Sequence, residues 1–491
     1  MTKNLLLTIS AGILLATGCS SETGIVSVRQ VQPDEIAVFR STDKKLEKAY
    51  EWARKTALSY SYPDADPVGS WYVASLPIRE AFCMRDVSHQ STGAQILGLA
   101  QHNKNMLTHI ADNIAESRDW CSYWEINRYG KPVPADYSND REFWYNLTAN
   151  PDVIQTCLGM YEWTGDRDYI HDPVFTGFYR HTVCDYVERW DLTPERIMDR
   201  KPYINQPENF DSDNKFHVCR GIPSYNENLP GLSLGVDLVA ALYGGHKAYS
   251  RLLALNDTTI THSTAADTAA SYRRMLETQW WNNCESRYHA GLMPDGTFVD
   301  SEGSLYILWF GATEDAGRIR HTLDEIASND WDIQYSSYFP EIFYRYGYCK
   351  EGYDYMISLP AMSTSEYPEV AFSLVSACVC GTMGFNPSYS GRSVSTISRL
   401  ENPGEESSIS NIAVFDGYMS VRHSGHNLTE ISNDTSVDLT WQASFMGDYT
   451  WIEAGSERIP AVRDRDVKGN TVSSAKIKLP ANSSLRAKAV I

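Results

Sequence analysis

The sequence predicts a mainly α-helical protein that ends in a small antiparallel β domain. Apolar residues recur at helical spacing from residue 42 to residue 386. Long loops rich in Trp, Tyr, Asn, Asp, Gly and Pro separate these helical stretches. After Asn386 the pattern changes to short runs typical of strands, with turn residues between them. These three observations together indicate a helical body, one face of which is built out by loops, followed by a β domain.

The helical body begins at Thr42, where Leu46, Tyr50, Ala53 and Leu58 share one helix face. Further helical stretches are expected at residues 88–101, 104–117, 151–164, 167–190, 231–246, 264–284, 302–311, 314–328, 338–348 and 366–383. The long loops between them cover residues 61–86, 118–150, 200–230 and 285–301. Loops of this length are usually functional or disordered, and these are too aromatic for disorder. We therefore expect them to form a site at one face of the helical scaffold.

The β domain is predicted from alternation and from turn signals. Strands are expected at residues 393–400, 412–415, 418–423, 428–431, 437–442, 450–453 and 475–479. Pairs such as Asp416-Gly417 and Ser424-Gly425 mark the turns between them. Alternation of this kind fits antiparallel strands with one face on a core. The domain boundaries that we expect place the helical domain at 42–386 and the β domain at 387–491.

The first residues have the pattern of a bacterial lipoprotein signal. Lys3 precedes an apolar run from Leu5 to Leu15, and Ala16-Thr17-Gly18-Cys19 follows it. The run is shorter than the roughly 20 apolar residues of a transmembrane helix. We expect a signal peptide at 1–18, lipidation of Cys19 and a polar tether at 19–41. The protein would then be exported and held at the outer membrane by its lipid anchor, with the side of the membrane left open.

Composition excludes some partners. The 43 Lys and Arg against 62 Asp and Glu give a formal net charge of −19, and loss of Lys3 with the signal peptide would make it −20. Such a charge argues against nucleic acid and against electrostatic binding to anionic lipid. Aromatic residues make up 12% of the chain and gather in the loops, as in sites that bind the flat faces of sugars.

Cysteine and motif searches point to no cofactor. Cys19 aside, nine cysteines remain, most of them in apolar helical contexts, so we interpret most as small buried hydrophobes. Cys378 and Cys380 lack a histidine pair at ligand spacing, so we expect neither zinc nor another metal. The chain has no dinucleotide-binding or P-loop glycine motif and no Gly-x-Ser-x-Gly elbow.

Two clusters in the long loops are candidates for a site. Residues 76–90 carry Arg85 and Asp86 just before a predicted helix, where they form either a structural ion pair or a pocket floor that binds sugar hydroxyls. Residues 118–146 concentrate Trp, Tyr, Asn and acidic residues without a helical period. Trp124, Glu125, Asp136 and Trp144 belong to this second cluster. A Glu beside Trp can have its pKa raised by loss of water, as a general acid requires.

Two further clusters each offer one carboxylate. Tyr225 and Glu227 lie in Gly221-Ile222-Pro223-Ser224-Tyr225-Asn226-Glu227-Asn228, where Glu227 either caps the next helix or reaches a cavity. Glu369 lies in Glu366-Tyr367-Pro368-Glu369, at the start of the last long apolar helix. Acids and Pro are common in a first helical turn, so a purely structural role is the alternative there.

The order of helices, the aromatic loops, Tyr367-Pro368-Glu369 and the trailing β domain resemble the six-hairpin glycosidase superfamily, over about residues 42 to 490. The resemblance implies an (α/α)6 toroid as catalytic domain, and an exo-acting, inverting hydrolase of oligo- or polysaccharides that uses two carboxylic acids. Our hypothesis makes Glu227 the general acid and Glu369 the base, with Glu125 in reserve. The residues that would bind the sugar are Arg85, Asp86, Trp124, Asp136, Trp144 and Tyr225.

Two other functions remain open at this stage. A non-catalytic glycan-binding lipoprotein would show a shallow aromatic platform in place of a deep pocket with paired carboxylates. A polysaccharide lyase or unsaturated-uronide hydrolase on the same toroid would need several cations at the pocket. The loops offer Arg79, Arg85, Arg128 and Arg220 for that purpose.

Overall fold

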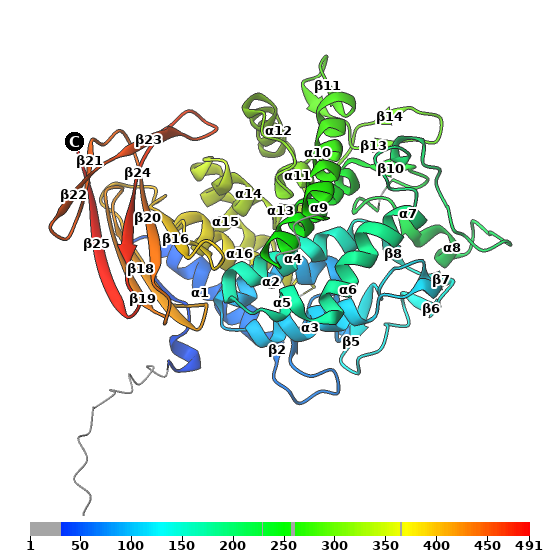
Figure 1. Ribbon diagram of the computed structural model, residues 1–491, viewed down its shortest axis with the longest axis horizontal. Coiled ribbons are helices and arrows are strands. Elements are labelled where there is room, and N and C mark those ends of the chain that lie inside the picture. Colours follow the sequence, from blue (N-terminus) through cyan, green and yellow to red (C-terminus); the bar gives the residue numbers. More distant parts are fainter. Residues whose placement is uncertain (1–30, 228, 257–260, 364–365) are drawn as a thin grey trace, which may run out of the picture. The chain divides into compact units, whose positions relative to one another are not determined.

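The computed structural model describes residues 31–227, 229–256, 261–363 and 366–491. The expected signal peptide at 1–18, the lipidation site Cys19 and most of the expected tether lie outside these described residues. Residues 32–491 form one compact unit. Figure 1 shows the orange and red strands of this unit gathered at one end and the helices filling the rest.

Twelve of the described helices form six consecutive pairs, in which the second helix is buried more completely than the first. The pairs are α1 (Lys44–Ser59) with α2 (Met84–Ile96), α3 (Ala100–Asp112) with α4 (Ala149–Thr164), α6 (Pro173–His181) with α9 (Val236–Leu255), α10 (Thr261–Gln279) with α11 (Leu305–Trp309), α12 (Ala316–Ser328) with α14 (Phe339–Arg345), and α15 (Cys349–Met362) with α16 (Glu369–Ser376).

The second helices of these pairs form an inner ring. Contacts join α2 to α4, α4 to α9, α9 to α11, α14 to α16 and α16 back to α2. Arg345 completes the ring, because its Nη1 donates to the carbonyl oxygens of Leu308 and Trp309 at 3.1 and 2.7 Å and so links α14 to α11. The expected (α/α)6 toroid is the observed architecture.

The sequence explains which helix of a pair lies inside. In α1 the buried residues are spaced along one stripe, which includes Leu46, Tyr50 and Ala53, and the other faces meet solvent. In α16 every residue is buried, so the helix is apolar on nearly all sides. Close approach in the ring depends on small residues: a Cβ at Gly93 of α2 would lie 2.1 Å from the carbonyl oxygen of Phe372 in α16.

The β part is a pair of sheets. The seven-stranded sheet has the order β1 (Val38–Ser41), β17 (Glu406–Val414), β18 (Gly417–Ser424), β19 (Leu428–Asp434), β25 (Ser483–Val490), β21 (Trp451–Ala454) and β22 (Glu457–Pro460). The five-stranded sheet has the order β15 (Asn386–Ser388), β16 (Ser393–Ile397), β20 (Leu439–Met446), β24 (Thr471–Leu479) and β23 (Val462–Arg465). All pairings within these two sheets are antiparallel, as expected, except that β16 and β20 run parallel.

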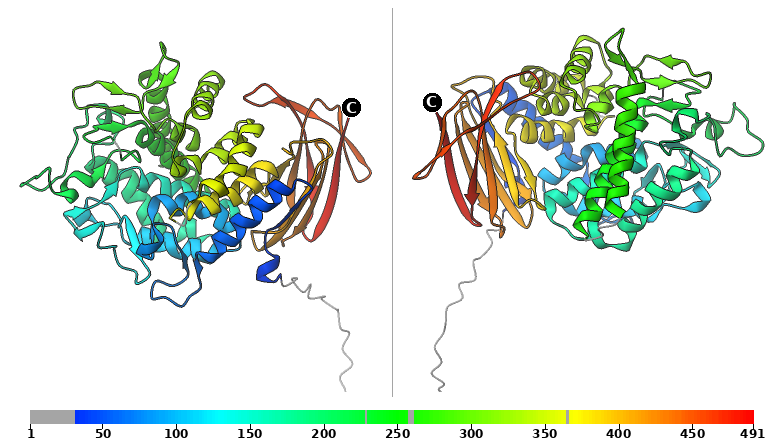
Figure 2. Two further views of the ribbon diagram at one scale, coloured as in Figure 1. Left: turned by 180° about the vertical axis from the view of Figure 1, so that it is seen from behind. Right: turned by 45° about the horizontal axis from the view of Figure 1, so that its top comes forward.

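The N-terminal end of the described chain belongs to the β part. Residues 38–41, at the end of the expected tether, form β1 and pair with β17, so that Val38 faces Ser410. The sheets also meet the helices directly, since Gln95 Nε2 of α2 donates to the carbonyl oxygen of Ala413 at 3.2 Å. In the left view of Figure 2 the blue helix α1 lies beside yellow helices α15 and α16, which it contacts.

Several element boundaries differ from expectation. Helix α2 begins at Met84, so Arg85 and Asp86, expected in a loop, lie in its first turn. The long helix expected at 167–190 is divided into α5 (Asp168–His171), α6, a π-helical segment (Thr182–Tyr186) and α7 (Val187–Arg189). The break before α6 falls at Asp172, which caps α6 ahead of Pro173. Among the described residues, no helix combines the length and apolar character needed to cross a membrane.

Candidate active site

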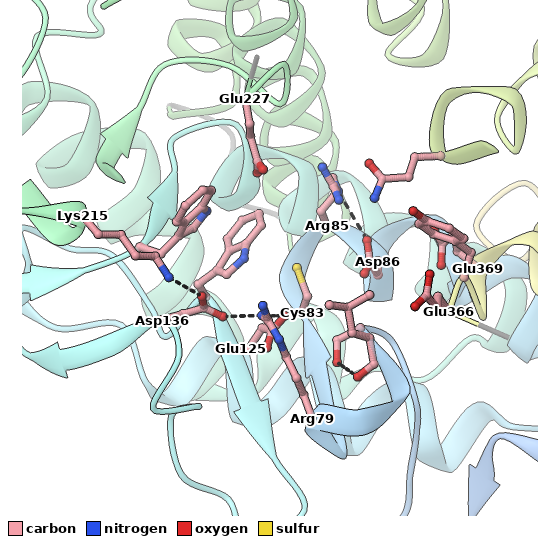
Figure 3. Close-up of a pocket in the computed structure, with 16 residues that line it drawn as sticks. Arg79, Cys83, Arg85, Asp86, Glu125, Asp136, Lys215, Glu227, Glu366 and Glu369 are labelled. Carbon is pink, nitrogen blue, oxygen red and sulfur yellow. Dashed lines mark hydrogen bonds and ion pairs between the residues drawn. The ribbon is translucent and has the colours of Figure 1, made fainter. Parts of the chain in front are cut away.

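One cavity of about 220 Å³ opens among the long loops and the first turns of the inner helices. Figure 3 shows its lining. The lining residues are Ser75, Leu76, Arg79, Cys83, Arg85, Asp86, Trp124, Glu125, Asp136, Trp144, Lys215, Glu227, Gln334, Glu366, Tyr367 and Glu369. Six of these are carboxylic acids and three are basic, so the cavity is polar and predominantly acidic.

Helix starts place several of the charged groups. Arg85 and Asp86 lie in the first turn of α2, and Glu369 is the first residue of α16. The first N–H groups of a helix have no partner within it, so acidic side chains are favoured there. Strand β4 (Ala81–Cys83) runs into α2 and pairs with β5 (Glu125–Asn127), with Cys83 opposite Glu125. This pairing brings Glu125 beside the start of α2.

Glu125 belongs to a charged cluster on one wall. Arg79 Nη1 donates to Glu125 Oε1 and to Asp136 Oδ2, both at 2.8 Å. Lys215 Nζ lies 3.8 Å from Asp136 Oδ1 and 5.4 Å from the centre of the Trp144 ring. Burial, and next the charge of Asp136, raise the pKa of Glu125 to about 8 against the opposing effect of Arg79.

Glu369 lies opposite, in the last inner helix. It is buried, and its pKa is raised to about 8 by that burial and next by the nearby Asp86 carboxylate. Asp86 accepts a hydrogen bond from Arg85 Nε at 3.3 Å, yet burial still raises the pKa of Asp86. The charge of one carboxylate makes ionisation of the other less favourable, so the titrations of Asp86 and Glu369 are linked.

Glu227 reaches the cavity from the loop that follows β9 (Arg220–Ile222); it is itself exposed, whereas residues 223–226 before it are buried. Asn146 Nδ2 donates to Glu227 Oε1 at 3.2 Å and to the carbonyl oxygen of Ser224 at 2.8 Å. Trp144 Nε1 donates to Asn146 Oδ1 at 2.8 Å, so the Asn146 amide connects the indole to the carboxylate. Loss of water around the carboxylate is the main reason that the pKa of Glu227 is raised.

Arg85 and Asp86 lie between the two outer acids. Figure 3 shows Glu227 on one side of the cavity, Glu369 on another and the Arg85–Asp86 ion pair between them. The charges of Arg85 and Asp86 act on both Glu227 and Glu369, Arg85 lowering and Asp86 raising each pKa. One ion pair is thus electrostatically coupled to both carboxylic acids.

Tyr225 is buried and is not among the residues that line the cavity. Its hydroxyl donates to Asp152 Oδ2 at 3.0 Å, and the Arg85 guanidinium lies 5.6 Å from the centre of its ring. Burial raises the pKa of Asp152 to about 7. Tyr225 therefore packs against the Arg85 guanidinium, and its contact with a sugar stays a prediction.

The structure brings the other predicted site residues together. Those that line the one cavity are Arg85, Asp86, Trp124, Glu125, Asp136, Trp144, Glu227 and Glu369. Ser75, Lys215 and Gln334 also line it but were not predicted. Lys215 starts the short helix α8 (Lys215–Cys219) and Gln334 lies in the four-residue helix α13 (Ile333–Ser336), and neither has a local pattern that would have identified it.

The three cations of the cavity are each paired. Arg79 bonds two carboxylates, Arg85 bonds Asp86, and Lys215 lies within 4 Å of Asp136. Over the residues that the structure describes, no group of three or more His, Cys, Asp or Glu side chains is arranged to hold a metal ion. The cavity thus offers carboxylates and aromatic rings to a ligand, with its positive charge already neutralised.

No family model matches the chain, and no curated protein matches its sequence. Among solved structures it is similar to an α-L-rhamnosidase from Dictyoglumus thermophilum, with a TM-score of 0.59, 11% identity, and 93% of this chain and 50% of that chain covered. A GH78 family rhamnosidase of Bacillus sp. GL1 gives a TM-score of 0.56, 12% identity, and 81% and 40% coverage. A provisionally assigned kojibiose phosphorylase from the human microbiome gives a TM-score of 0.55 and 8% identity, with 91% of this chain and 63% of that chain covered.

The likeness is one of fold. The chain spans 40%, 50% and 63% of the lengths of these three proteins, at identities of 8–12%. All three alignments cover four fifths or more of this chain, and so include most of its helical toroid. This protein therefore has the toroid fold that known glycoside hydrolases share with phosphorylases, joined to β sheets.

Proposed function

We propose that this protein is a glycoside hydrolase that uses two carboxylic acids, Glu227 and Glu369, on an uncharged sugar. The observation that carries the proposal is that both acids line one cavity from different elements, each with a raised pKa. Titratable groups in a cleft with pKa values shifted by burial and by a specific charged neighbour are typical of catalytic sites. The toroid fold and the aromatic residues of the lining also support the proposal of a glycoside hydrolase.

In this mechanism Glu369 accepts a proton from a water molecule as that water attacks the anomeric carbon. Glu227 donates a proton to the oxygen that leaves with the other half of the substrate. One glycosidic bond and one water are consumed, and a free sugar and an alcohol are released with inversion. Such pairs of carboxyl groups stand roughly 6.5 to 9.5 Å apart, so that the water fits between base and sugar.

Exposure supports this division of roles. Glu227 is exposed, so that a leaving group beside it can depart into solvent, whereas Glu369 is buried at the start of α16. Glu125 is less suited to either role because Arg79 already donates to it and to its neighbour Asp136. We assign Arg85, Asp86 and the Trp124 and Trp144 rings to sugar binding, with Tyr225 as support.

Charge balance weighs against acidic sugars. A uronic acid would need an unpaired Arg or Lys, and each cation of the cavity already lies against a carboxylate. An added carboxylate would also meet the six acids of the lining. An uncharged sugar offers hydroxyls, which can donate to these carboxylates and accept from Arg85. The charges of the lining residues therefore favour a hydrolase of neutral sugars over a lyase or an unsaturated-uronide hydrolase.

Export and lipidation at Cys19 are part of the proposal. They are supported by the pattern of Lys3, the apolar run from Leu5 to Leu15 and the small residues before Cys19. Labelling with a radioactive fatty acid in a bacterial host tests the anchor, because Cys19→Ala should abolish the label.

The deciding experiment is chromatography of the sugars released from a broad panel of plant and host glycans. The chain without residues 1–19 is compared with its Glu369→Gln variant and with Glu51→Gln, a control on the surface of α1. Release by the first and third proteins but not by the second supports the proposal. Parallel reactions with inorganic phosphate separate hydrolysis from phosphorolysis, since the latter yields a sugar phosphate. Binding without release from any glycan would instead indicate a capture protein.

The pH dependence of the reaction should be controlled by Asp86. The base must be ionised, and the negative charge of Asp86 raises the pKa of Glu369. In the wild type the limb of the kcat/KM profile that reports ionisation of Glu369 should therefore lie at higher pH than that of an ordinary glutamate. Asp86→Asn removes the repelling charge, lowers the pKa of Glu369 and should move this limb to lower pH.

Profiles of kcat/KM against pH for wild type and Asp86→Asn test this prediction. Asp354→Asn, which removes a carboxylate paired with Lys350 on the surface of α15, serves as the control. Because the midpoint is read from the shape of the profile, a weaker overall activity of Asp86→Asn does not obscure it. An unchanged midpoint, or one moved to higher pH, would contradict the assigned base.

A further inference from the structure

A second, smaller cavity adjoins the first. Its volume is about 90 Å³, and it shares Trp144 and Glu227 with the larger cavity. The remaining wall is mainly aliphatic and includes Val218, Ile222 and Leu232. Among the described residues, Glu227 is the only charged one that lines it. Glu227, which we assign as general acid, thus lines both a polar cavity and a mainly apolar one.

The side chains that line this cavity determine which chemical group it can bind. A sugar ring placed there would lose most of the hydrogen bonds that water gives its hydroxyls, because the side chains around it are mainly aliphatic and, among the described residues, few besides Glu227 and Tyr203 can replace them. Each unpaired hydroxyl would cost free energy of binding. An apolar group gains from the same transfer out of water. The cavity is therefore suited to a hydrocarbon group and unsuited to a second sugar.

We propose that this cavity binds a compact apolar part of the leaving alcohol. The inference rests on the proposed function: a general acid protonates the oxygen that joins sugar and leaving group, so the leaving group must lie next to Glu227. The volume is smaller than the engineered cavity of about 150 Å³ that holds benzene. A branched alkyl group fits this size. The substrate is then a glycoside of an apolar alcohol, in which the sugar occupies the larger cavity.

Two glycosides of the sugar that the release assay identifies form the test. Methyl and isobutyl glycosides release alcohols of similar acidity, so a difference between them reports binding of the alkyl group. We expect the wild type to prefer the isobutyl glycoside by roughly 10-fold in kcat/KM. A disaccharide of the same sugar should be the poorest of the three.

The matched variant is Val218→Thr, which keeps the shape of the side chain and replaces a methyl group by a hydroxyl. It should lower kcat/KM for the isobutyl glycoside by roughly 10-fold and for the methyl glycoside by less than about 2-fold. Val437→Thr makes the same change at a half-buried position in the β part and should alter neither. Ile222→Thr is a second cavity variant in case Val218→Thr folds poorly.

A binding measurement separates this inference from the proposed function. Ligand-observed NMR with isobutanol needs no catalysis, and the signal should weaken in Val218→Thr and persist in Val437→Thr. That result without any sugar release would leave the apolar site standing and remove the hydrolase. Equal binding of isobutanol by both variants would overturn the inference. An equal loss of kcat/KM for the methyl and isobutyl glycosides in Val218→Thr would also overturn it.

Discussion

Glu369→Gln is expected to lower kcat/KM by roughly 1,000-fold or more, because the amide cannot accept a proton from the attacking water. The glutamine keeps the size of the side chain at the start of α16, so the cavity should keep its shape. Substrate binding should therefore change little, and the loss should fall on kcat. Steady-state kinetics with the sugar identified by the release assay measure both parameters. A loss confined to KM would show that Glu369 binds the sugar without acting as base.

The same variant should be more stable than wild type in alkaline solution. The folded protein holds the pKa of Glu369 near 8, whereas an unfolded chain has a glutamate pKa of about 4.3. Between these values the folded state binds a proton that the unfolded state releases, so stability from this group falls as the pH rises and is lost above pH 8. Melting temperatures of Glu369→Gln and wild type should be similar at pH 4 and should separate at pH 9, with the variant higher.

Glu227→Gln is expected to lose most activity on substrates whose leaving group must be protonated, and least on substrates whose leaving group departs as a stable anion. Glycosides of ordinary alcohols should lose roughly 1,000-fold in kcat/KM. A dinitrophenyl glycoside releases dinitrophenolate, which is a stable anion, so the variant should cleave this substrate almost as well as the wild type does.

Because Asn146 donates to Glu227 Oε1, the proton should be carried by Oε2. Asn146→Ala should then weaken the reaction through Glu227 and affect the dinitrophenyl glycoside least.

Comparison of the two glycosides in each variant is the measurement. Glu369→Gln is the natural control, since loss of the base should affect both substrates alike. An equal loss on both substrates in Glu227→Gln would argue that Glu227 has another role, and would move the acid assignment to Glu125.

The sequence predicts the helices of the fold best where the spacing of apolar residues is regular. Helix α16 and the amphipathic α1 are examples, since packing follows directly from their patterns. Helix α15 was not predicted, because Pro360 lies inside it and few of its residues are buried. Strand β25 was missed for a related reason: only two of its eight residues are buried, and its sequence is rich in Ser, Lys and Arg. The ring closure between α2 and α16 joins distant parts of the chain that no local pattern connects.

The site was predictable where chemistry is concentrated along the chain. Glu125 and Trp124 were found because acids and aromatics crowd one loop, and the structure places both in the cavity. Which groups pair across the cavity depends on the fold. The contact of Arg79 with Asp136 joins residues 57 positions apart, and the hydrogen bond of the Tyr225 hydroxyl with Asp152 joins residues 73 apart.

The pairing of β1 with β17 has a consequence for how the chain is made. Val38 pairs with Ser410, so the edge of the seven-stranded sheet cannot form until nearly the whole chain has been synthesised. At roughly 5–20 residues per second, the ribosome needs about 20 to 75 s to cover that interval. Closure of α2 against α16 must wait in the same way. Contacts so distant in sequence make folding slow, and the apolar inner helices made first remain uncovered meanwhile. The nascent protein should therefore depend on a holding chaperone until its last helices emerge.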